Sequence, residues 1–179
     1  MKVIFLDFDG VICTRDSIAG AHEFAKADKS GDRNLYSAQM IDPILVGNLN
    51  EVVKETGAVV VVSSAWRHLH DMKEVREFLR INGFLGKVID RTPVWKEYKD
   101  EIGVKTTNDL ERFWEYERGN EIKMWLDKHP EVESFVILDD EISDIFPVFP
   151  YNYIRTDMEN GFHEGLIKEV IKMLNKEED

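Results

Sequence analysis

The sequence predicts an α/β protein with a Rossmann-like three-layer sandwich, in which helices cover both faces of a central parallel sheet. Apolar runs of strand length alternate with segments whose apolar residues recur at helical spacing, which is typical of βαβ units. The run at residues 58–62, AVVVV, is continuous and β-branched, as a parallel strand covered on both faces requires. A chain of 179 residues can bury a sizeable core, and we expect residues 1–179 to form a single domain.

Five strands are predicted from short apolar runs. The run at 58–62 is the clearest of them, because a glycine precedes it and two serines follow it. The predicted strands occupy residues 2–8, 58–62, 87–89, 135–138 and 153–155.

Four helices are predicted between these strands. Their apolar residues recur three and four positions apart, and Gly57, Gly83 and Pro130 follow the first three of them. The predicted helices occupy residues 43–56, 71–82, 120–128 and 165–175. Two further segments, 13–39 and 91–117, fit neither pattern, and we interpret them as small insertions between sheet elements.

The composition limits the classes of function. A formal net charge of −12 disfavours extended binding to nucleic acid, although a local basic group could still hold one phosphate. The single cysteine, Cys13, excludes an intramolecular disulfide and is typical of a reducing compartment. The apolar N-terminal stretch is too short for a signal peptide, and no apolar run reaches membrane-spanning length. We therefore expect a cytoplasmic protein without a membrane partner.

Polar residues follow three of the predicted strands directly, and these are the candidate site residues. In a parallel sheet the carboxyl ends of the strands meet at one edge, where ligands bind. One acid at a strand end is commonly a helix cap, but two acidic pairs and a hydroxyl pair at one edge are less easily explained in that way. The three pairs are Asp7 and Asp9, Ser63 and Ser64, and Asp139 and Asp140.

Clustered carboxylates repel one another unless a cation lies among them. Oxygen ligands favour a hard ion, and Mg²⁺ is the usual one where a phosphate completes the coordination. An aspartate beside Mg²⁺ can attack phosphorus and form an aspartyl-phosphate, and a second carboxylic acid can protonate the leaving oxygen. The pattern therefore favours phosphoryl transfer with Mg²⁺ as the cofactor.

These residues resemble the motifs of the haloacid dehalogenase (HAD) superfamily. Asp7-Phe8-Asp9-Gly10-Val11 is similar to its first motif, DxDGV, and Ser63 at a strand end is similar to its second. The third motif is a Lys or Arg near a helix start, a position that Arg118 fits. Asp139-Asp140, followed by Asp144, resembles the fourth. The resemblance covers residues 2–144 and implies the HAD variant of the predicted fold.

The resemblance also implies roles for the residues. Asp7 would be the nucleophile, and Asp9 would be the general acid and base. Ser63 would hydrogen-bond the phosphoryl group, and Arg118 would offset negative charge. The second aspartate of the first motif separates phosphatases from dehalogenases in this superfamily, and it is present here. The implied metal ligands are Asp7, Asp9 through its backbone carbonyl, Asp139, Asp140 and Asp144.

Three longer segments resemble a HAD subgroup of bacterial and phage proteins that includes domains attached to RNA-repair proteins. These are SSAWR at 63–67, RGNEIKMWL at 118–126 and ILDDE at 137–141, and the subgroup is distantly similar to the phosphatase half of phage polynucleotide kinase/phosphatase. The resemblance implies that Arg67 is a second phosphate-binding cation, with a salt-bridged arginine as the alternative. We interpret Trp66 as a packing residue rather than a platform for base stacking.

Two assignments stay open at this point. Ser64 could replace Ser63 in binding the phosphoryl group if the preceding strand runs one residue further. Lys123 could replace Arg118, although it lies inside the helical pattern.

The expected function is that of a phosphomonoesterase whose substrate is a nucleotide, a nucleic-acid end or a small phosphomonoester. In the HAD superfamily, large insertions after the first motif or between the second and third form caps that close over small metabolites. Both insertions here are small, so the resemblance implies a lightly capped site that can admit a macromolecular end. One alternative is a non-catalytic module that uses Mg²⁺ as a structural ion, which would not need the general acid Asp9. A phosphomutase is a further alternative, but it would need a closed cap to keep water from the aspartyl-phosphate.

Overall fold

The structure, a computed structural model, describes residues 1–94 and 117–176. Its centre is a five-stranded sheet in the order β3-β2-β1-β4-β5, and every neighbouring pair of strands is parallel. The strands are β1 (Lys2–Leu6), β2 (Val59–Val62), β3 (Val88–Arg91), β4 (Ser134–Asp139) and β5 (Tyr153–Arg155). All five predicted strands are present, and the α/β fold class is confirmed.

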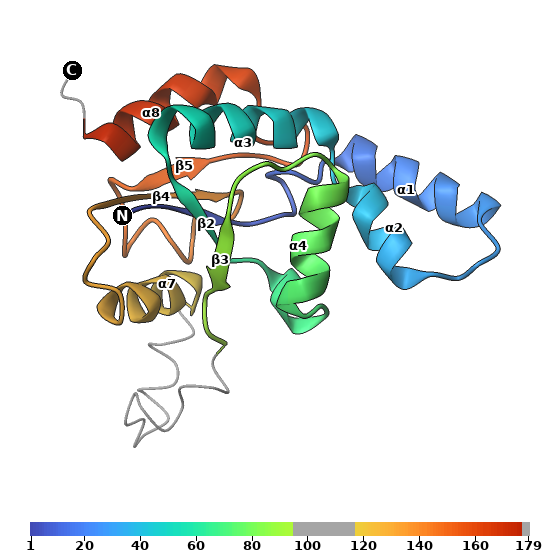
Figure 1. Ribbon diagram of the computed structural model, residues 1–179, viewed down its shortest axis with the longest axis horizontal. Coiled ribbons are helices and arrows are strands. Elements are labelled where there is room, and N and C mark those ends of the chain that lie inside the picture. The colour runs from blue at the N-terminus through green and yellow to red at the C-terminus, as the bar shows by residue number, and fades with distance from the viewer. Residues whose placement is uncertain (95–116, 177–179) are drawn as a thin grey trace.

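Helices cover both faces of this sheet, as Figure 1 shows, with α3 and α8 on one side and α7 on the other. The helices of the core are α3 (Pro43–Thr56), α4 (Met72–Ile81), α7 (Glu117–Asp127) and α8 (Ile167–Asn175). Short 3₁₀ turns, η1 (Ala65–His68) and η2 (Glu164–Leu166), precede α4 and α8. This is the predicted three-layer arrangement.

The core divides into two clusters because successive side chains of a strand point to opposite faces of the sheet. Ile4 and Leu6 of β1 join the cluster that contains the apolar faces of α3, α4 and α8. Val3 and Phe5 join the other cluster, which Ile122 of α7 enters. All four strand residues are fully buried, so β1 is covered on both sides.

The first insertion is helical, which the sequence pattern did not predict. It forms α1 (Arg15–Ala27) and α2 (Arg33–Met40), two helices that extend to one side of the sheet in Figure 1. Thr14 starts α1 with a capping box, and the Asp32 carboxylate caps α2 by accepting from two backbone N–H groups. Ala21 is the one residue of α1 that is buried, so little of this helix joins the core. Most of the second insertion, residues 95–116, lies outside the described residues.

Element boundaries differ from the predicted ones by a few residues at functional positions. The first strand ends at Leu6 rather than at residue 8, so Asp7 lies just beyond it. Helix α7 begins at Glu117, three residues earlier than predicted, so Arg118 lies in its first turn.

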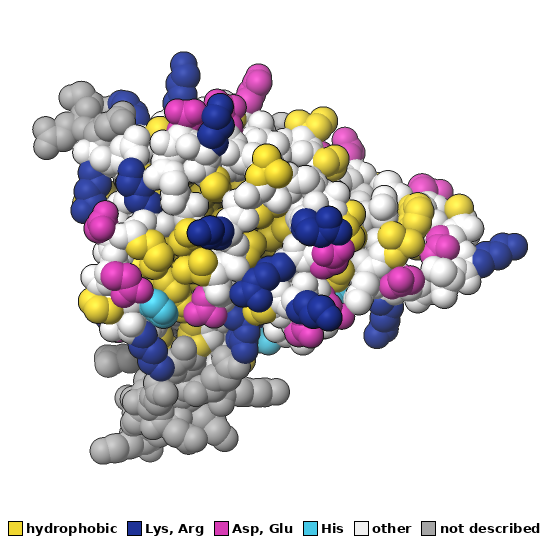
Figure 2. All heavy atoms as spheres, viewed as in Figure 1, with side chains coloured by type: hydrophobic (Ala, Val, Ile, Leu, Met, Phe, Trp, Pro, Cys, Tyr) yellow, Lys and Arg dark blue, Asp and Glu magenta, His cyan; other side chains and the backbone are white. Residues whose placement is uncertain are grey.

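On the face shown in Figure 2, acidic and basic side chains are interspersed and hydrophobic ones gather between α3 and α7. Within the described ranges, no helix combines the length and apolarity needed to span a membrane.

Candidate active site

The register of the sheet brings the predicted residues together. Leu6 of β1 pairs with Val62 of β2 and with Leu138 of β4. The residue after each of these is Asp7, Ser63 and Asp139, so the three lie side by side at the carboxyl edge. Backbone hydrogen bonds hold them there, because Asp7 N donates to Leu138 O at 3.0 Å and Ser63 N donates to Leu6 O at 2.8 Å.

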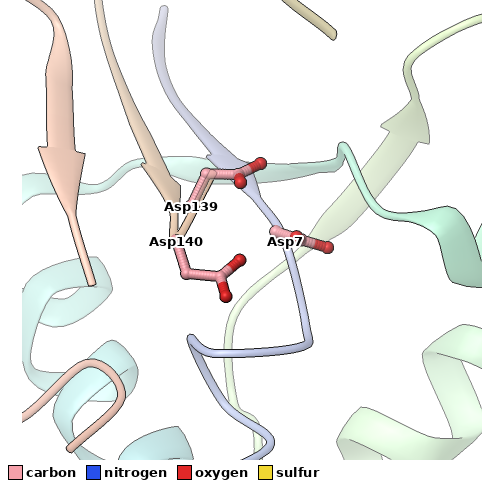
Figure 3. Close-up of side chains that lie close together, drawn as sticks. All are labelled: Asp7, Asp139 and Asp140. Carbon is pink, nitrogen blue, oxygen red and sulfur yellow. The ribbon is translucent and has the colours of Figure 1, made fainter. Parts of the chain in front are cut away.

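Three carboxylates converge at this edge, as Figure 3 shows. One oxygen from each of Asp7, Asp139 and Asp140 lies within 4.8 Å of the others. Asp7 and Asp139 are buried, and Asp140 is half-buried. Burial raises the pKa of Asp139 to about 8, and burial together with the charge of Asp7 raises the pKa of Asp140. An all-oxygen set of clustered acids fits Mg²⁺, whose charge would relieve the repulsion among them.

The loop after β1 brings the chain against Asp140. The Phe8 carbonyl accepts hydrogen bonds from the N–H groups of Val11, Ile12 and Cys13 at 2.8–3.1 Å, which closes a tight turn. Gly10 has φ +69° in this turn, and a Cβ on it would lie 2.5 Å from the Asp140 Cγ. A side chain at this position is therefore excluded both by backbone conformation and by space.

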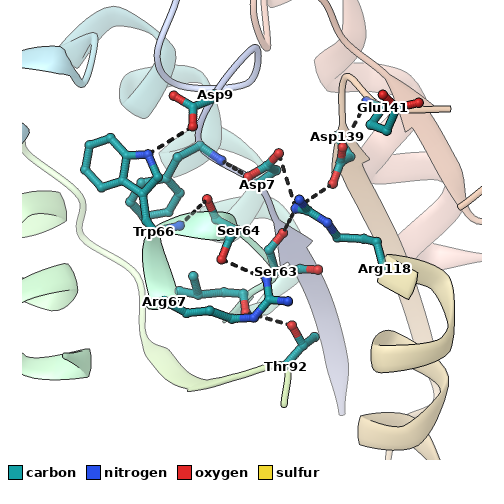
Figure 4. A network of polar contacts seen from close by, with 12 residues as sticks. Asp7, Asp9, Ser63, Ser64, Trp66, Arg67, Thr92, Arg118, Asp139 and Glu141 are labelled. Carbon is teal, nitrogen blue, oxygen red and sulfur yellow. Dashed lines mark hydrogen bonds and ion pairs between the residues drawn. The ribbon is translucent and has the colours of Figure 1, made fainter. Parts of the chain in front are cut away.

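Arg118 reaches this edge from the first turn of α7 (Figure 4). Its Nη1 lies 3.3 Å from Asp7 Oδ2 and 3.1 Å from Asp139 Oδ2, and it also donates to the Ser63 carbonyl. Burial alone would lower the pKa of Arg118, but the two carboxylates outweigh it and raise that pKa. Lys123, the alternative, is exposed on α7 and pairs with Asp127 at 2.8 Å. The position at the carboxylates is thus filled by Arg118.

The two serines after β2 have different surroundings. The Ser64 hydroxyl accepts a hydrogen bond from Trp66 N at 3.3 Å and caps η1. The Ser63 hydroxyl is buried and has no hydrogen-bond partner among the described residues. An unpaired buried hydroxyl is costly unless a ligand completes its bonding. This difference favours Ser63 as the group that contacts the phosphoryl oxygens.

Arg67 is held in a buried ion pair with Glu121 of α7. Their side chains are 3% and 1% exposed, and Arg67 Nη1 also donates to the Ser64 carbonyl at 2.7 Å. Arg67 is therefore a salt-bridged arginine, which is the alternative to a phosphate-binding cation that the sequence left open. Arg67 Nε and Glu121 Oε1 have no partner within the described part of the chain. Arg67 and Arg118 thus bind two successive carbonyls, those of Ser64 and Ser63.

Asp9 and Asp144 lie outside the group of three carboxylates. Asp9 is half-buried, and burial followed by the charge of Asp7 raises its pKa. This shift is in the direction that a general acid requires. Asp144 lies beside α7, where its carbonyl accepts from Gly119 N at 3.2 Å and its carboxylate accepts from Ser143 Oγ at 3.2 Å.

Comparison with family models gives one match, which spans residues 3–166 and is described as the HAD domain in Swiss Army Knife RNA repair proteins. The chain belongs to this HAD family. Searches of curated proteins and of solved structures gave no significant match. Membership confirms the resemblance drawn from the motifs and supports a HAD-type phosphohydrolase.

Two residues of this HAD domain contribute to the site without having been predicted to do so. Glu121 neutralises Arg67, and Trp66 donates from its indole nitrogen to Asp9 Oδ2 at 3.1 Å. Both residues lie inside the segments that resemble the RNA-repair subgroup, so the sequence contained a positional signal. It gave no indication of which residues they contact, because Arg67 and Asp9 lie 54 and 57 residues away in the sequence.

Gly119 of the HAD domain offers a test of how tightly α7 is positioned. A Cβ on Gly119 would lie 2.6 Å from the Asp144 carbonyl oxygen and 2.8 Å from Val148 Cγ2. We expect Gly119→Ala to lower the free energy of unfolding by about 1–3 kcal/mol, because neighbouring backbone must shift. Gly47→Ala in α3, where a Cβ meets nothing within 4 Å, should instead raise it by about 0.5–1 kcal/mol.

Urea unfolding of the two glycine variants measures both effects. Equal stabilisation by the two substitutions would contradict the close contact between α7 and the segment around Asp144.

Proposed function

We propose that the chain is a Mg²⁺-dependent phosphomonoesterase that works through an aspartyl-phosphate on Asp7. The observation that carries this proposal is the meeting of three carboxylates with Arg118 and the unpaired Ser63 hydroxyl at one edge. The carboxylates suit a hard cation, and the arginine and the hydroxyl suit phosphoryl oxygens. No single one of these groups would indicate phosphoryl transfer, but their combination does.

Asp7 is oriented for attack by the backbone N–H of Phe8 and by Arg118. Its Oδ1 accepts from Phe8 N at 2.7 Å, and its Oδ2 faces the Arg118 guanidinium at 3.3 Å. In the first step an Asp7 oxygen bonds to phosphorus, the bond from phosphorus to the ester oxygen breaks, and Asp9 gives its proton to that oxygen. Asp7, Asp139 and Asp140 would hold Mg²⁺, which supplies positive charge beside the phosphoryl group.

The second step regenerates Asp7. Asp9, now a carboxylate, takes a proton from water, and the water oxygen bonds to phosphorus as the bond to Asp7 breaks. Inorganic phosphate leaves, and Asp9 is protonated again for the next turnover. Arg118 and Ser63 contact the phosphoryl oxygens in both steps.

We further propose that the substrate carries its phosphate at a nucleic-acid end or on a nucleotide. Two observations support this. The family description refers to RNA repair, and α1 and α2 form only a small insertion after the first motif. The net charge of −12 makes extended binding along a nucleic-acid backbone unfavourable, so recognition should concentrate on the terminal phosphate.

Phosphate release tests the proposal. We expect the protein to hydrolyse p-nitrophenyl phosphate with Mg²⁺ and to lose this activity in EDTA. Among 3′- and 5′-phosphorylated oligonucleotides, nucleotides and phosphosugars, the nucleic-acid substrates should give the highest kcat/KM.

Two other results would contradict the proposed function. Thermal stabilisation by Mg²⁺ without turnover of any substrate would favour a non-catalytic module. Interconversion of phosphosugars without phosphate release would favour a phosphomutase.

A further inference from the structure

Trp66 lies directly behind the first motif. It is 4% exposed, and its ring packs against Phe8, His70 and Phe78 at centroid distances of 4.9, 5.7 and 6.2 Å. The Ser64 hydroxyl accepts from its backbone N–H and fixes the turn that carries it. Rings on several sides of the indole leave it little freedom to rotate.

The indole nitrogen points at Asp9, as Figure 4 shows. Trp66 Nε1 donates to Asp9 Oδ2 at 3.1 Å. Among the described residues, this is the one side-chain hydrogen bond that the Asp9 carboxyl makes. An indole N–H is a donor only, so the oxygen facing it must accept. When Asp9 is protonated, this contact favours the proton on Oδ1, the oxygen that the indole does not contact, because a carbonyl oxygen accepts better than a hydroxyl oxygen.

We propose that Trp66 is a positioning residue that fixes the Asp9 carboxyl through this hydrogen bond, so that the oxygen free of the indole is the one that delivers the proton to the ester oxygen. This inference rests on the proposed function, since it assigns a task within that reaction. A rigid indole does this at small entropic cost, because packing has already fixed it. A carboxyl that rotates freely would present the wrong oxygen in part of the population.

Loss of this positioning should affect substrates differently, according to their leaving groups. An alkoxide leaves poorly unless it is protonated as the bond to phosphorus breaks, whereas p-nitrophenolate is stable without a proton. Misplacing the acid should therefore slow hydrolysis of an alkyl phosphate more than hydrolysis of p-nitrophenyl phosphate. A loss of fold alone would slow both substrates equally.

The chain supplies a matched control. Trp125 is also buried, at 3% exposure, and its indole nitrogen also donates to an aspartate, Asp90 Oδ2, at 2.7 Å. It packs in the cluster between the sheet and α7 rather than beside Asp9. Trp125→Phe thus removes the same kind of ring and hydrogen bond as Trp66→Phe without touching the general acid.

The experiment compares both variants with the wild type on β-glycerophosphate and p-nitrophenyl phosphate. For Trp66→Phe we expect kcat/KM, which reports the step in which the leaving group departs, to fall about 100-fold on the alkyl ester and less than tenfold on the aryl ester. Trp125→Phe should leave the ratio of the two rates as in the wild type. Equal losses on both substrates for Trp66→Phe, or the same ratio in both variants, would overturn the positioning role.

A measurement without turnover tests the contact itself. In a ¹H–¹⁵N spectrum, the indole signal that Trp66→Phe removes is that of Trp66. Asp9→Ala should shift this signal upfield and leave the Trp125 indole signal in place. An unmoved Trp66 signal would overturn the inference even in an active enzyme. A wild type that releases phosphate no faster than Asp7→Asn would instead overturn the proposed function, and the positioning role with it.

Discussion

Replacing Asp7 with asparagine is expected to reduce phosphate release by at least about 10⁴-fold, because the neutral amide is not a nucleophile toward phosphorus. The substitution keeps the shape of the side chain, and an amide oxygen can still accept from Phe8 N, as Asp7 Oδ1 does now at 2.7 Å. The fold should therefore survive. Release of inorganic phosphate from p-nitrophenyl phosphate measures the loss, and thermal unfolding in EDTA checks the fold.

Asp127→Asn is the matched control for this substitution. Asp127 is a carboxylate on α7 whose side chain is 63% exposed and pairs with Lys123. Its replacement should leave the rate within about twofold of the wild type, since surface ion pairs contribute little. Activity of Asp7→Asn within tenfold of the control would rule out Asp7 as the nucleophile.

Removing Glu121 alone is expected to lower the free energy of unfolding more than the glycine substitution in α7 does. Glu121→Ala would leave Arg67 as a buried cation without its partner, which costs about 3–5 kcal/mol. Burial raises the pKa of Glu121 to about 7 even though Arg67 lowers it, so desolvation outweighs the attraction between them. The attraction within the pair therefore matters less for stability than the buried, uncompensated charge that remains when one partner is lost.

The double variant Arg67→Met/Glu121→Leu separates these two effects. It removes both charges and fills the space, so it should recover most of the stability lost in Glu121→Ala. The Ser64 carbonyl loses the donor that Arg67 provides at 2.7 Å, which limits the recovery. Urea unfolding measures both variants. A double variant as unstable as the single one would contradict the assignment of the loss to an uncompensated Arg67.

The sequence predicted the positions of the chemistry better than the contacts around it. The pairs that contain Asp7, Ser63 and Asp139 could be placed at one edge because strand ends in a parallel sheet meet there. That prediction required the strand pattern alone. The apolar runs define the strands, and the ends of the strands place these residues.

Contacts between distant side chains could not be predicted in this way. Neither strand nor helix periodicity indicates that Glu121 pairs with Arg67, or that Trp66 donates to Asp9. The helices at Arg15–Ala27 and Arg33–Met40 were missed for a related reason. Few of their residues are buried, and the signals that mark their starts are the capping side chains of Thr14 and Asp32.

The position of β1 at the centre of the sheet affects how the molecule loses structure. Strands β1, β2 and β4 are each hydrogen-bonded on both sides, and only β3 and β5 form edges of the described sheet. Amide hydrogens in doubly paired, buried strands exchange with solvent mainly through global unfolding, whereas edges open locally. Asp7, Ser63 and Asp139 are attached to these slowly exchanging strands. Fraying at either edge of the sheet thus leaves the arrangement of these three residues intact until the molecule unfolds globally.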